Sequence, residues 1–107
     1  MKQEFLAEVR AAARKKILYL PHALHRMSTK GGFITTRDVR DVIANGVMIE
    51  DYPEDVRGHS CLILGADKDG GPIHVVCAPK DDYLAIITAY RPDKRKWYDD
   101  YSRRRRS

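Results

Sequence analysis

Residues 60–90 read SCLILGADKDGGPIHVVCAPKDDYLAIITAY, and this stretch decides the fold. Three apolar runs, Cys61–Leu64, Ile73–Ala78 and Tyr83–Tyr90, are separated by two short polar segments. The first of these segments holds two adjacent glycines, which adopt positive φ at no steric cost. Apolar runs of this length between tight turns are typical of neighbouring antiparallel strands. We therefore predict a three-stranded antiparallel meander.

The residues before the meander predict helices. Apolar side chains recur at three- and four-residue spacing over residues 3–19, which indicates a long amphipathic helix. Proline is tolerated in the first turn of a helix but not in its interior, so Pro21 predicts a bend and a second, short helix over His22–Met27. The residue types over Thr35–Asp38 suit a capping box at the start of a third helix, with Gly46 available as its left-handed cap.

The period of the pattern changes to two at Val47, and Val47–Tyr52 predicts a fourth strand or a sheet edge. The fold class that follows is α+β, with two or three N-terminal helices packed on a four-stranded antiparallel sheet. The chain of 107 residues has the size of one domain. We place that domain at residues 1–101.

The C-terminal end combines aromatic and basic residues. Asp93–Tyr101 predicts a short helix with Trp97 and Tyr98 on one side, together with Tyr101. Four consecutive arginines follow at residues 103–106 and are too charged to pack. We expect residues 102–107 to form a mobile basic tail.

Composition excludes several classes of protein. Hydrophobic residues make up 43% and charged residues 33%, as in ordinary globular proteins. No apolar stretch approaches the roughly 18 residues of a membrane span, and the first residues lack an apolar signal segment, so we expect a cytoplasmic protein without a membrane partner. Cys61 and Cys77 lack metal-ligand spacing, and we expect both to be reduced. Phosphate-binding-loop, zinc-protease and dinucleotide motifs are missing, so the sequence predicts no cofactor and no metal.

The net charge of +5 is concentrated at the two ends of the chain. Residues 91–107 hold eight Lys or Arg against three Asp, a surplus of five. Residues 1–26 hold six basic and two acidic groups, whereas residues 27–90 hold six and ten. Basic clusters attract nucleic acid or an acidic protein. If the fold brings the basic ends together they mark an RNA groove; if it leaves them apart, the tail is a solubilising appendage.

Three residues of the short second helix, and one strand residue, suit proton transfer near a phosphate. His22 and His25 are three residues apart, with Arg26 beside them. Histidine moves protons near neutral pH, and arginine stabilises charge that builds on phosphate oxygens. A surface pair of histidines is the alternative interpretation. His74 lies in the middle of a predicted strand, where a structural histidine is the alternative.

Two polar residues share one face of the last predicted strand. Thr88 and Tyr90 are two residues apart, so their side chains point the same way. A hydroxyl and a phenol side by side can hydrogen-bond a phosphate, and tyrosine can stack on a base. Ordinary strand residues are the alternative. The candidate catalytic residues are therefore His22, Arg26, His74, Thr88 and Tyr90.

Aromatic residues among cations suit single-stranded nucleic acid, through base stacking and phosphate contacts. Trp97 stands in such a run, and docking of the tail on the sheet is the alternative role. The basic ends and one loop arginine, for which a solvated loop residue is the alternative, complete the candidate RNA-binding set. Its members are Arg14, Lys15, Lys16, Arg57, Arg91, Lys94, Arg95, Lys96 and Trp97.

The order of these short motifs resembles a bacterial family. HALHRM at residues 22–27 is followed by ITTRDV at 34–39, PIHVV at 72–76 and ITAYRP at 87–92. This series, with its H-A-x-x-R-M opening and T-x-Y last strand, resembles an uncharacterised family placed among RelE-like toxins. The resemblance covers residues 20–101 and leaves out the N-terminal helix.

The resemblance implies a small α+β ribonuclease fold that cleaves RNA without a metal, by attack of the ribose 2′-hydroxyl on the adjacent phosphate. Related nucleases use helix histidines and a Ser/Thr-x-Tyr on the last strand, which correspond here to His22, Arg26, Thr88 and Tyr90. It further implies an mRNA-cleaving toxin of a type II toxin–antitoxin pair. Its partners would be RNA, free or on the ribosome, and a cognate antitoxin protein.

Two other classes of function remain open from the sequence. A non-catalytic module would bind RNA with the same sheet and basic tail. A structural protein would dock its acidic middle or its basic helix on another chain. Convergence of His22, Thr88 and Tyr90 on one concave face would favour catalysis, and their separation would favour binding.

Overall fold

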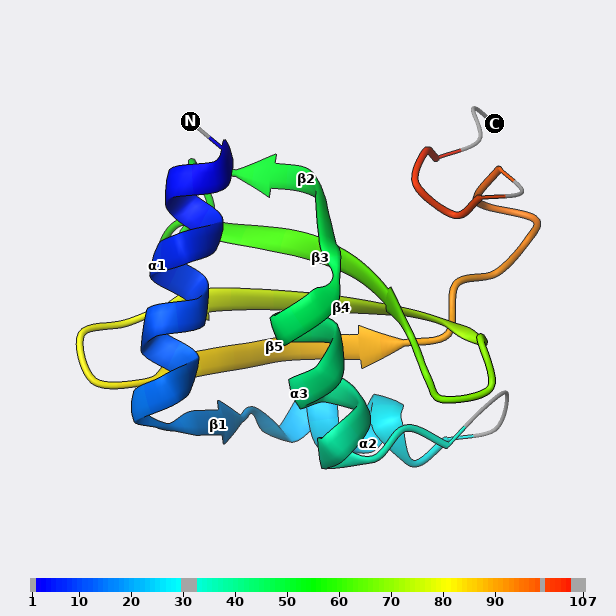
Figure 1. Ribbon diagram of the computed structural model, residues 1–107, viewed down its shortest axis with the longest axis horizontal. Coiled ribbons are helices and arrows are strands. Elements are labelled where there is room, and N and C mark those ends of the chain that lie inside the picture. The colour runs from blue at the N-terminus through cyan, green and yellow to red at the C-terminus, as the bar shows by residue number, and fades with distance from the viewer. Residues whose placement is uncertain (1, 30–32, 99, 105–107) are drawn as a thin grey trace.

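The computed structural model describes residues 2–29, 33–98 and 100–104. These residues form three helices and five strands, which confirms the α+β class (Figure 1). In chain order the elements are α1 (Lys2–Lys15), β1 (Ile17–Tyr19), α2 (Pro21–Met27), α3 (Thr36–Asn45), β2 (Val47–Tyr52), β3 (Ser60–Ala66), β4 (Pro72–Pro79) and β5 (Leu84–Tyr90).

The strands form one sheet in the order β1-β5-β4-β3-β2. β3, β4 and β5 make the antiparallel meander that the sequence predicts, and β2 adds the fourth antiparallel strand. β1 then pairs with β5 in parallel. The expectation of a four-stranded antiparallel sheet was therefore wrong, because the sheet is mixed and has five strands.

β1 occupies residues that we expected in the first helix. α1 ends at Lys15, and Ile17–Tyr19 pair with Leu84–Ile86 of β5. A residue before proline disfavours the helical conformation, and Leu20, which precedes Pro21, is extended with φ −70° and ψ 154°. The helix must end before that point, and the β-branched and aromatic side chains that follow α1 suit a strand on the free edge of β5.

α1 and α3 lie across one face of the sheet, and the main core sits between these layers (Figure 1). Val9 of α1, Val39 of α3 and Val75 of β4 are fully buried in this core. α2 packs beside β5 and contributes Ala23 and Met27. Full burial of one aliphatic side chain stabilises the fold by about 1.5–3 kcal/mol.

α3 begins with the predicted capping box but ends differently from the prediction. The Asp38 backbone N–H donates to the Thr35 hydroxyl, and the Thr35 N–H donates to the Asp38 carboxylate. Gly46 is not left-handed, because its φ is −80° and its ψ 179°. A Cβ there would lie 2.5 Å from the Val42 carbonyl oxygen and 2.6 Å from that of Leu64. Glycine at this position therefore permits close approach of α3 to β3 rather than a special φ.

The segment after β5 is not the predicted helix. Residues 93–98 and 100–104, which we name the C-terminal strap, form turns and one isolated antiparallel bridge between Trp97 and Arg104. Trp97 is buried, with 2% of its surface exposed, so the aromatic residue docks the strap on the sheet. Arg104 also packs, although we expected mobility from residue 102 onward; residues 105–107 of that tail lie outside the described residues.

The two cysteines are free, buried and directly opposite each other, Cys61 on β3 and Cys77 on β4. A hydrogen bond with the Cys61 thiol and burial raise the pKa of Cys77 well above its ordinary value. High thiol pKa values keep cysteines protonated and slow to react. The pair behaves as part of the apolar core.

Candidate functional site

Three of the candidate catalytic residues lie on the face of the sheet opposite α1 and α3. Ile73 and Val75 belong to the main core, so the strand alternation turns His74 to the other face. His74 is the cross-strand partner of Tyr90, and Val76 is the partner of Thr88. The meander therefore brings imidazole, phenol and hydroxyl groups into adjacent positions.

His74 is fully buried and makes two hydrogen bonds. Its Nε2 lies 2.8 Å from the backbone carbonyl oxygen of Tyr101, which only accepts hydrogen bonds, so Nε2 carries the proton. Its Nδ1, 3.3 Å from the Tyr90 hydroxyl, is then the acceptor. Burial lowers the pKa of His74. The residue is thus a neutral imidazole at pH 7 whose free lone pair points at the Tyr90 phenol.

Tyr90 lies between this imidazole and a cation. The Arg26 guanidinium carbon of α2 lies 4.8 Å from the centre of the Tyr90 ring, and the rings of Tyr90 and His74 meet edge to face at 5.3 Å. Burial raises the pKa of Tyr90, which keeps the phenol protonated at neutral pH. A protonated phenol can act as a general acid, because it can donate its proton to an oxygen that develops negative charge.

The two helix histidines stay apart from this cluster. His22 is exposed and lies one turn before Arg26, on the same side of α2. His25 is exposed as well. Among the described residues, no hydrogen bond or ring contact joins either of them to His74 or Tyr90. His22 therefore does not join the cluster of His74, Thr88 and Tyr90; it only shares one side of α2 with Arg26.

Thr88 holds a buried hydroxyl that is not satisfied. Its Oγ1 has no hydrogen-bond partner within the described ranges. An unpaired buried hydroxyl costs about 1–3 kcal/mol, and such groups in folded proteins call for an explanation. A ligand oxygen that accepts or donates at this position would remove the cost.

The C-terminal strap covers the cluster. The Trp97 ring meets the His74 ring edge to face at 4.3 Å, and the Arg104 guanidinium carbon lies 4.8 Å from the centre of the Trp97 ring. Tyr101 has a φ of 61°, a left-handed conformation that costs a non-glycine residue about 1–2 kcal/mol. The strap therefore holds its place through side-chain contacts, against local strain.

Glu50 and Tyr52 of β2 fix the far end of the strap. Glu50 Oε2 lies 3.0 Å from Arg104 Nε, and the Tyr52 hydroxyl donates to Glu50. Burial and the hydrogen bond to Glu50 raise the pKa of Tyr52 to about 12. Sequence reasoning missed these two residues as part of the site, although the period of two in β2 places them on one face. No sequence pattern indicated that the strap would pass beside β2 and bring Arg104 to Glu50.

Most members of the candidate RNA-binding set already have partners. Arg57, Arg91 and Arg95 form ion pairs at 2.6–3.0 Å, with Asp55, Asp67 and Asp93 respectively. Lys15 Nζ donates to the Asp81 carbonyl oxygen, and Trp97 is buried. Arg14, Lys16, Lys94 and Lys96 have exposed side chains.

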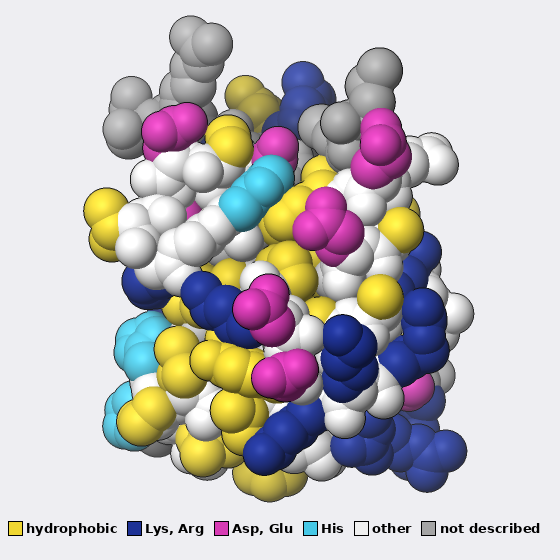
Figure 2. All heavy atoms as spheres, turned by 90° about the vertical axis from the view of Figure 1, so that its left-hand side faces the viewer, with side chains coloured by type: hydrophobic (Ala, Val, Ile, Leu, Met, Phe, Trp, Pro, Cys, Tyr) yellow, Lys and Arg dark blue, Asp and Glu magenta, His cyan; other side chains and the backbone are white. Residues whose placement is uncertain are grey.

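The fold leaves the two basic ends apart. Lys15 contacts the connection between β4 and β5, whereas Arg91 follows the opposite end of β5. A strand of this length spans about 20 Å. Figure 2 shows Lys and Arg side chains gathered at its lower right, on the side of the helix layer. The two basic ends therefore do not form a single RNA groove in the described part of the chain.

Side chains that could hold a metal ion do not cluster in the part of the chain that the structure describes: it contains no group of three or more His, Cys, Asp or Glu in suitable positions. None of its helices is long and apolar enough to cross a membrane.

Comparison with known proteins gives one finding. A family model described as Domain of unknown function (DUF4258) matches residues 19–91, well over half of the chain. No curated protein and no solved structure matches the chain. The matched residues include all five candidate catalytic residues and leave out α1 and the strap. The chain therefore belongs to the DUF4258 family.

Proposed function

We propose that this protein is a metal-independent endoribonuclease with a RelE-like site, the toxin of a type II toxin–antitoxin pair. One observation supports the proposal most strongly. α2 and the two neighbouring strands β4 and β5 bring Arg26 and His74 into contact with Tyr90, which lies two residues along β5 from Thr88, whose hydroxyl has no partner among the described residues. A cation, a proton donor and a proton acceptor are the groups that phosphodiester cleavage requires.

In this proposal each group has one role in cleavage. His22, which is exposed, takes the proton from the ribose 2′-hydroxyl as its oxygen forms a bond to phosphorus. As the old phosphorus–oxygen bond breaks, the Tyr90 O–H turns from His74 Nδ1 to the departing 5′-oxygen and gives it the proton; before that step the hydrogen bond to His74 holds the phenol in place, so His74 is a positioning residue. Arg26 and Thr88 stabilise the charge on the non-bridging oxygens. The products are a 2′,3′-cyclic phosphate and a 5′-hydroxyl.

Substrate access requires movement of the C-terminal strap. Trp97 contacts the His74 ring, and the Arg104 guanidinium lies over the Trp97 ring. The strap is anchored to the sheet by the Arg104–Glu50 ion pair, and an exposed pair of this kind contributes about 0–1 kcal/mol. An arriving RNA phosphate can compete for Arg104 and free the strap.

The experiment is expression in bacteria, with growth and transcript ends followed for three proteins: wild type, the double variant His22→Ala with Tyr90→Phe, and the control His25→Ala. His25 is exposed on the same helix and has no place in the cluster. We expect arrested growth and new 5′ ends for wild type and control, and neither for the double variant. Identical growth and intact transcripts in all three would contradict the proposal.

A second candidate is a non-catalytic RNA-binding or protein-interaction module on the same fold. Two observations favour it: the complete burial of His74 beneath Trp97, and the separation of His22 from the cluster, to which no hydrogen bond or ring contact among the described residues joins it. It predicts RNA binding that weakens steeply between about 50 and 200 mM salt, with the RNA left intact.

A further inference from the structure

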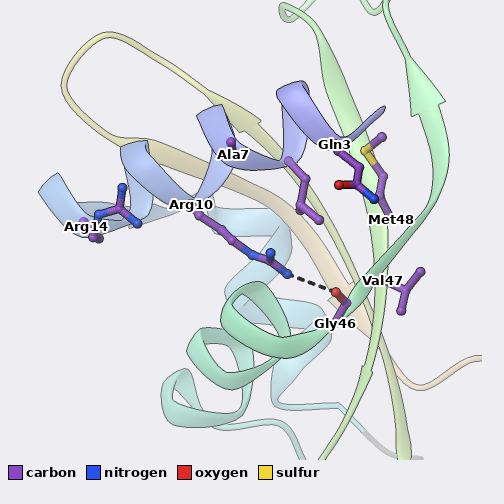
Figure 3. Close-up of a pocket in the computed structure, with 8 residues that line it drawn as sticks. Gln3, Ala7, Arg10, Arg14, Gly46, Val47 and Met48 are labelled. Carbon is purple, nitrogen blue, oxygen red and sulfur yellow. Dashed lines mark hydrogen bonds between the residues drawn. The ribbon is translucent and has the colours of Figure 1, made fainter. Parts of the chain in front are cut away.

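A groove on the helix side of the molecule carries unpaired positive charge over an apolar floor. It consists of two adjoining hollows of about 560 and 410 Å³ that share Arg10 and Arg14. Figure 3 shows the first hollow, with Arg10 reaching from α1 to Gly46 at the start of β2. We name these hollows together the α1–β2 groove; their lining includes Leu6, Arg10, Arg14, Arg40, Val47 and Met48.

The three arginines of the groove lack the partners that other arginines of this chain have. Within the described ranges the Arg10 side chain donates to two backbone carbonyl oxygens, those of Ile43 at 2.9 Å and Gly46 at 3.1 Å, and to no carboxylate. Arg14 and Arg40 are exposed and form no ion pair within the described part of the chain. The lining contains no Asp or Glu at all. The groove thus holds three positive charges without a negative one.

The apolar residues in the floor of the groove favour an acidic peptide over single-stranded RNA as the ligand. Every apolar residue of the lining is aliphatic or methionine, and none is aromatic. Single-stranded RNA binds strongly where bases can stack on aromatic rings, which this lining does not offer. Aliphatic side chains of a peptide can fill such a floor while its carboxylates meet the arginines.

The edge of the sheet beside the groove suits an extended segment. β2 is the last strand in the sheet order, so one of its edges has no strand partner among the described residues. Val47 at its start is 63% exposed. An extended peptide adds to such an edge through main-chain hydrogen bonds, and alternate side chains then give specificity.

We infer that the α1–β2 groove binds an extended acidic segment of another protein, in which carboxylate and aliphatic side chains share the face that meets the groove. The carboxylates pair with Arg14 and Arg40, and the aliphatic side chains cover Leu6 and Met48. This inference does not depend on ribonuclease activity, because the groove and the candidate catalytic cluster lie on opposite faces of the sheet. α1 supplies half of the groove and lies outside the matched family region.

The test measures binding of a fluorescein-labelled synthetic peptide with a Glu-Ser-Val-Ser repeat, whose Glu and Val side chains share one face when the peptide is extended, by fluorescence anisotropy with the full chain. The test variant is Arg14→Glu with Arg40→Glu, which leaves the structural Arg10 in place. The matched control is Lys68→Glu with Lys96→Glu, which changes net charge equally at exposed residues outside the groove. We expect the test variant to weaken binding about tenfold or more, and the control less than about twofold.

Nuclear magnetic resonance then locates the peptide. We expect its addition to shift the amide signals of α1 and of residues 46–49. No binding, or equal loss in test variant and control, would overturn the inference. Displacement of the peptide by an oligouridylate would also overturn the inference, because the occupant would then be RNA. Dimers formed by wild type but not by the Arg14→Glu, Arg40→Glu variant would overturn it as well, because the occupant would then be a second copy of the chain.

Discussion

Thr88 is the residue at which stability and function are expected to conflict. Its Oγ1 is buried and has no partner in the described part of the chain, while that of Thr29 donates to the Arg26 carbonyl oxygen at 2.9 Å. Thr88→Val removes an unsatisfied group and should raise the free energy of unfolding by about 1 kcal/mol. Thr29→Val breaks a hydrogen bond and should lower it. Urea unfolding of both variants checks this, and destabilisation by Thr88→Val would show that the hydroxyl is satisfied.

If Thr88 contacts the phosphate, the more stable Thr88→Val variant should also cleave RNA more slowly, because the hydroxyl no longer stabilises the developing charge.

His74 gives the protein a pH dependence of known sign. Its folded pKa is lowered by burial, while in the unfolded chain it binds a proton below about pH 6.5. Between the folded and the unfolded pKa the unfolded state binds more protons, so the free energy of unfolding falls as the pH falls. We expect wild type to lose stability between about pH 7.5 and pH 5.5, and His74→Gln to lose less over that range.

Urea unfolding at the two pH values makes the comparison. The carboxylates whose pKa values are lowered, such as Asp67 and Asp93, lose their contribution only as the pH falls below their unfolded pKa of about 4. They leave this window nearly undisturbed. Equal losses in wild type and His74→Gln would show that His74 titrates normally.

At the scale of elements, the junction of α3 with β2 depends on the absence of a side chain. Gly46→Ala would place a methyl group within 2.6 Å of two carbonyl oxygens, and backbone atoms cannot yield as side chains do. We expect a loss of about 1–3 kcal/mol or more in the free energy of unfolding. Gly70→Ala is the comparison, since that glycine has φ +85° with nothing nearby and should cost about 1–2 kcal/mol. A smaller loss for Gly46→Ala than for Gly70→Ala would contradict the packing argument.

The C-terminal strap should open when its aromatic anchor is removed. Trp97→Ala deletes the ring that covers His74, so the imidazole becomes exposed and its pKa returns towards the ordinary value. Titration of His74 by nuclear magnetic resonance measures this directly. Tyr98→Ala, a change at a residue that is 39% exposed, should leave the His74 pKa low. A low pKa in the Trp97→Ala variant would mean that something other than the strap buries His74.

The sequence pattern was sufficient wherever local chemistry determined the element. The meander, α2 behind its proline and the capping box of α3 follow from periodicity and from single residues. β1 and the strap did not follow, because both depend on distant partners. Ile17–Tyr19 become a strand only where β5 offers a free edge, and residues 93–98 avoid a helix because Trp97 reaches His74 and Arg104 reaches Glu50.

The candidate site shows the same division. His74, Thr88 and Tyr90 could be grouped from strand alternation alone, since the turn lengths fix which strands are neighbours. The contact of Arg26 with Tyr90 needed the position of α2 at the sheet edge, and the role of Glu50 needed the path of the strap.

At the scale of the molecule, charge is divided between two faces. The arginines of the α1–β2 groove lie on the helix side, while Arg26 and Arg104 lie with the candidate catalytic cluster on the other side. Because the two surfaces do not overlap, the proposed binding of an acidic protein segment and the proposed cleavage of RNA can be tested independently of each other.

The central claim is that Arg26, His74 and Tyr90, with His22 and Thr88, cleave RNA without a metal. The most direct measurement incubates the purified protein with end-labelled single-stranded RNA in the presence of EDTA and identifies the product ends. We predict that wild type and His25→Ala produce 2′,3′-cyclic phosphate ends. We predict that Trp97→Ala cleaves the RNA faster than wild type, and that Tyr90→Phe cleaves it about a hundredfold or more slowly. Intact RNA with wild type and Trp97→Ala, or equal cleavage by Tyr90→Phe, would contradict the account.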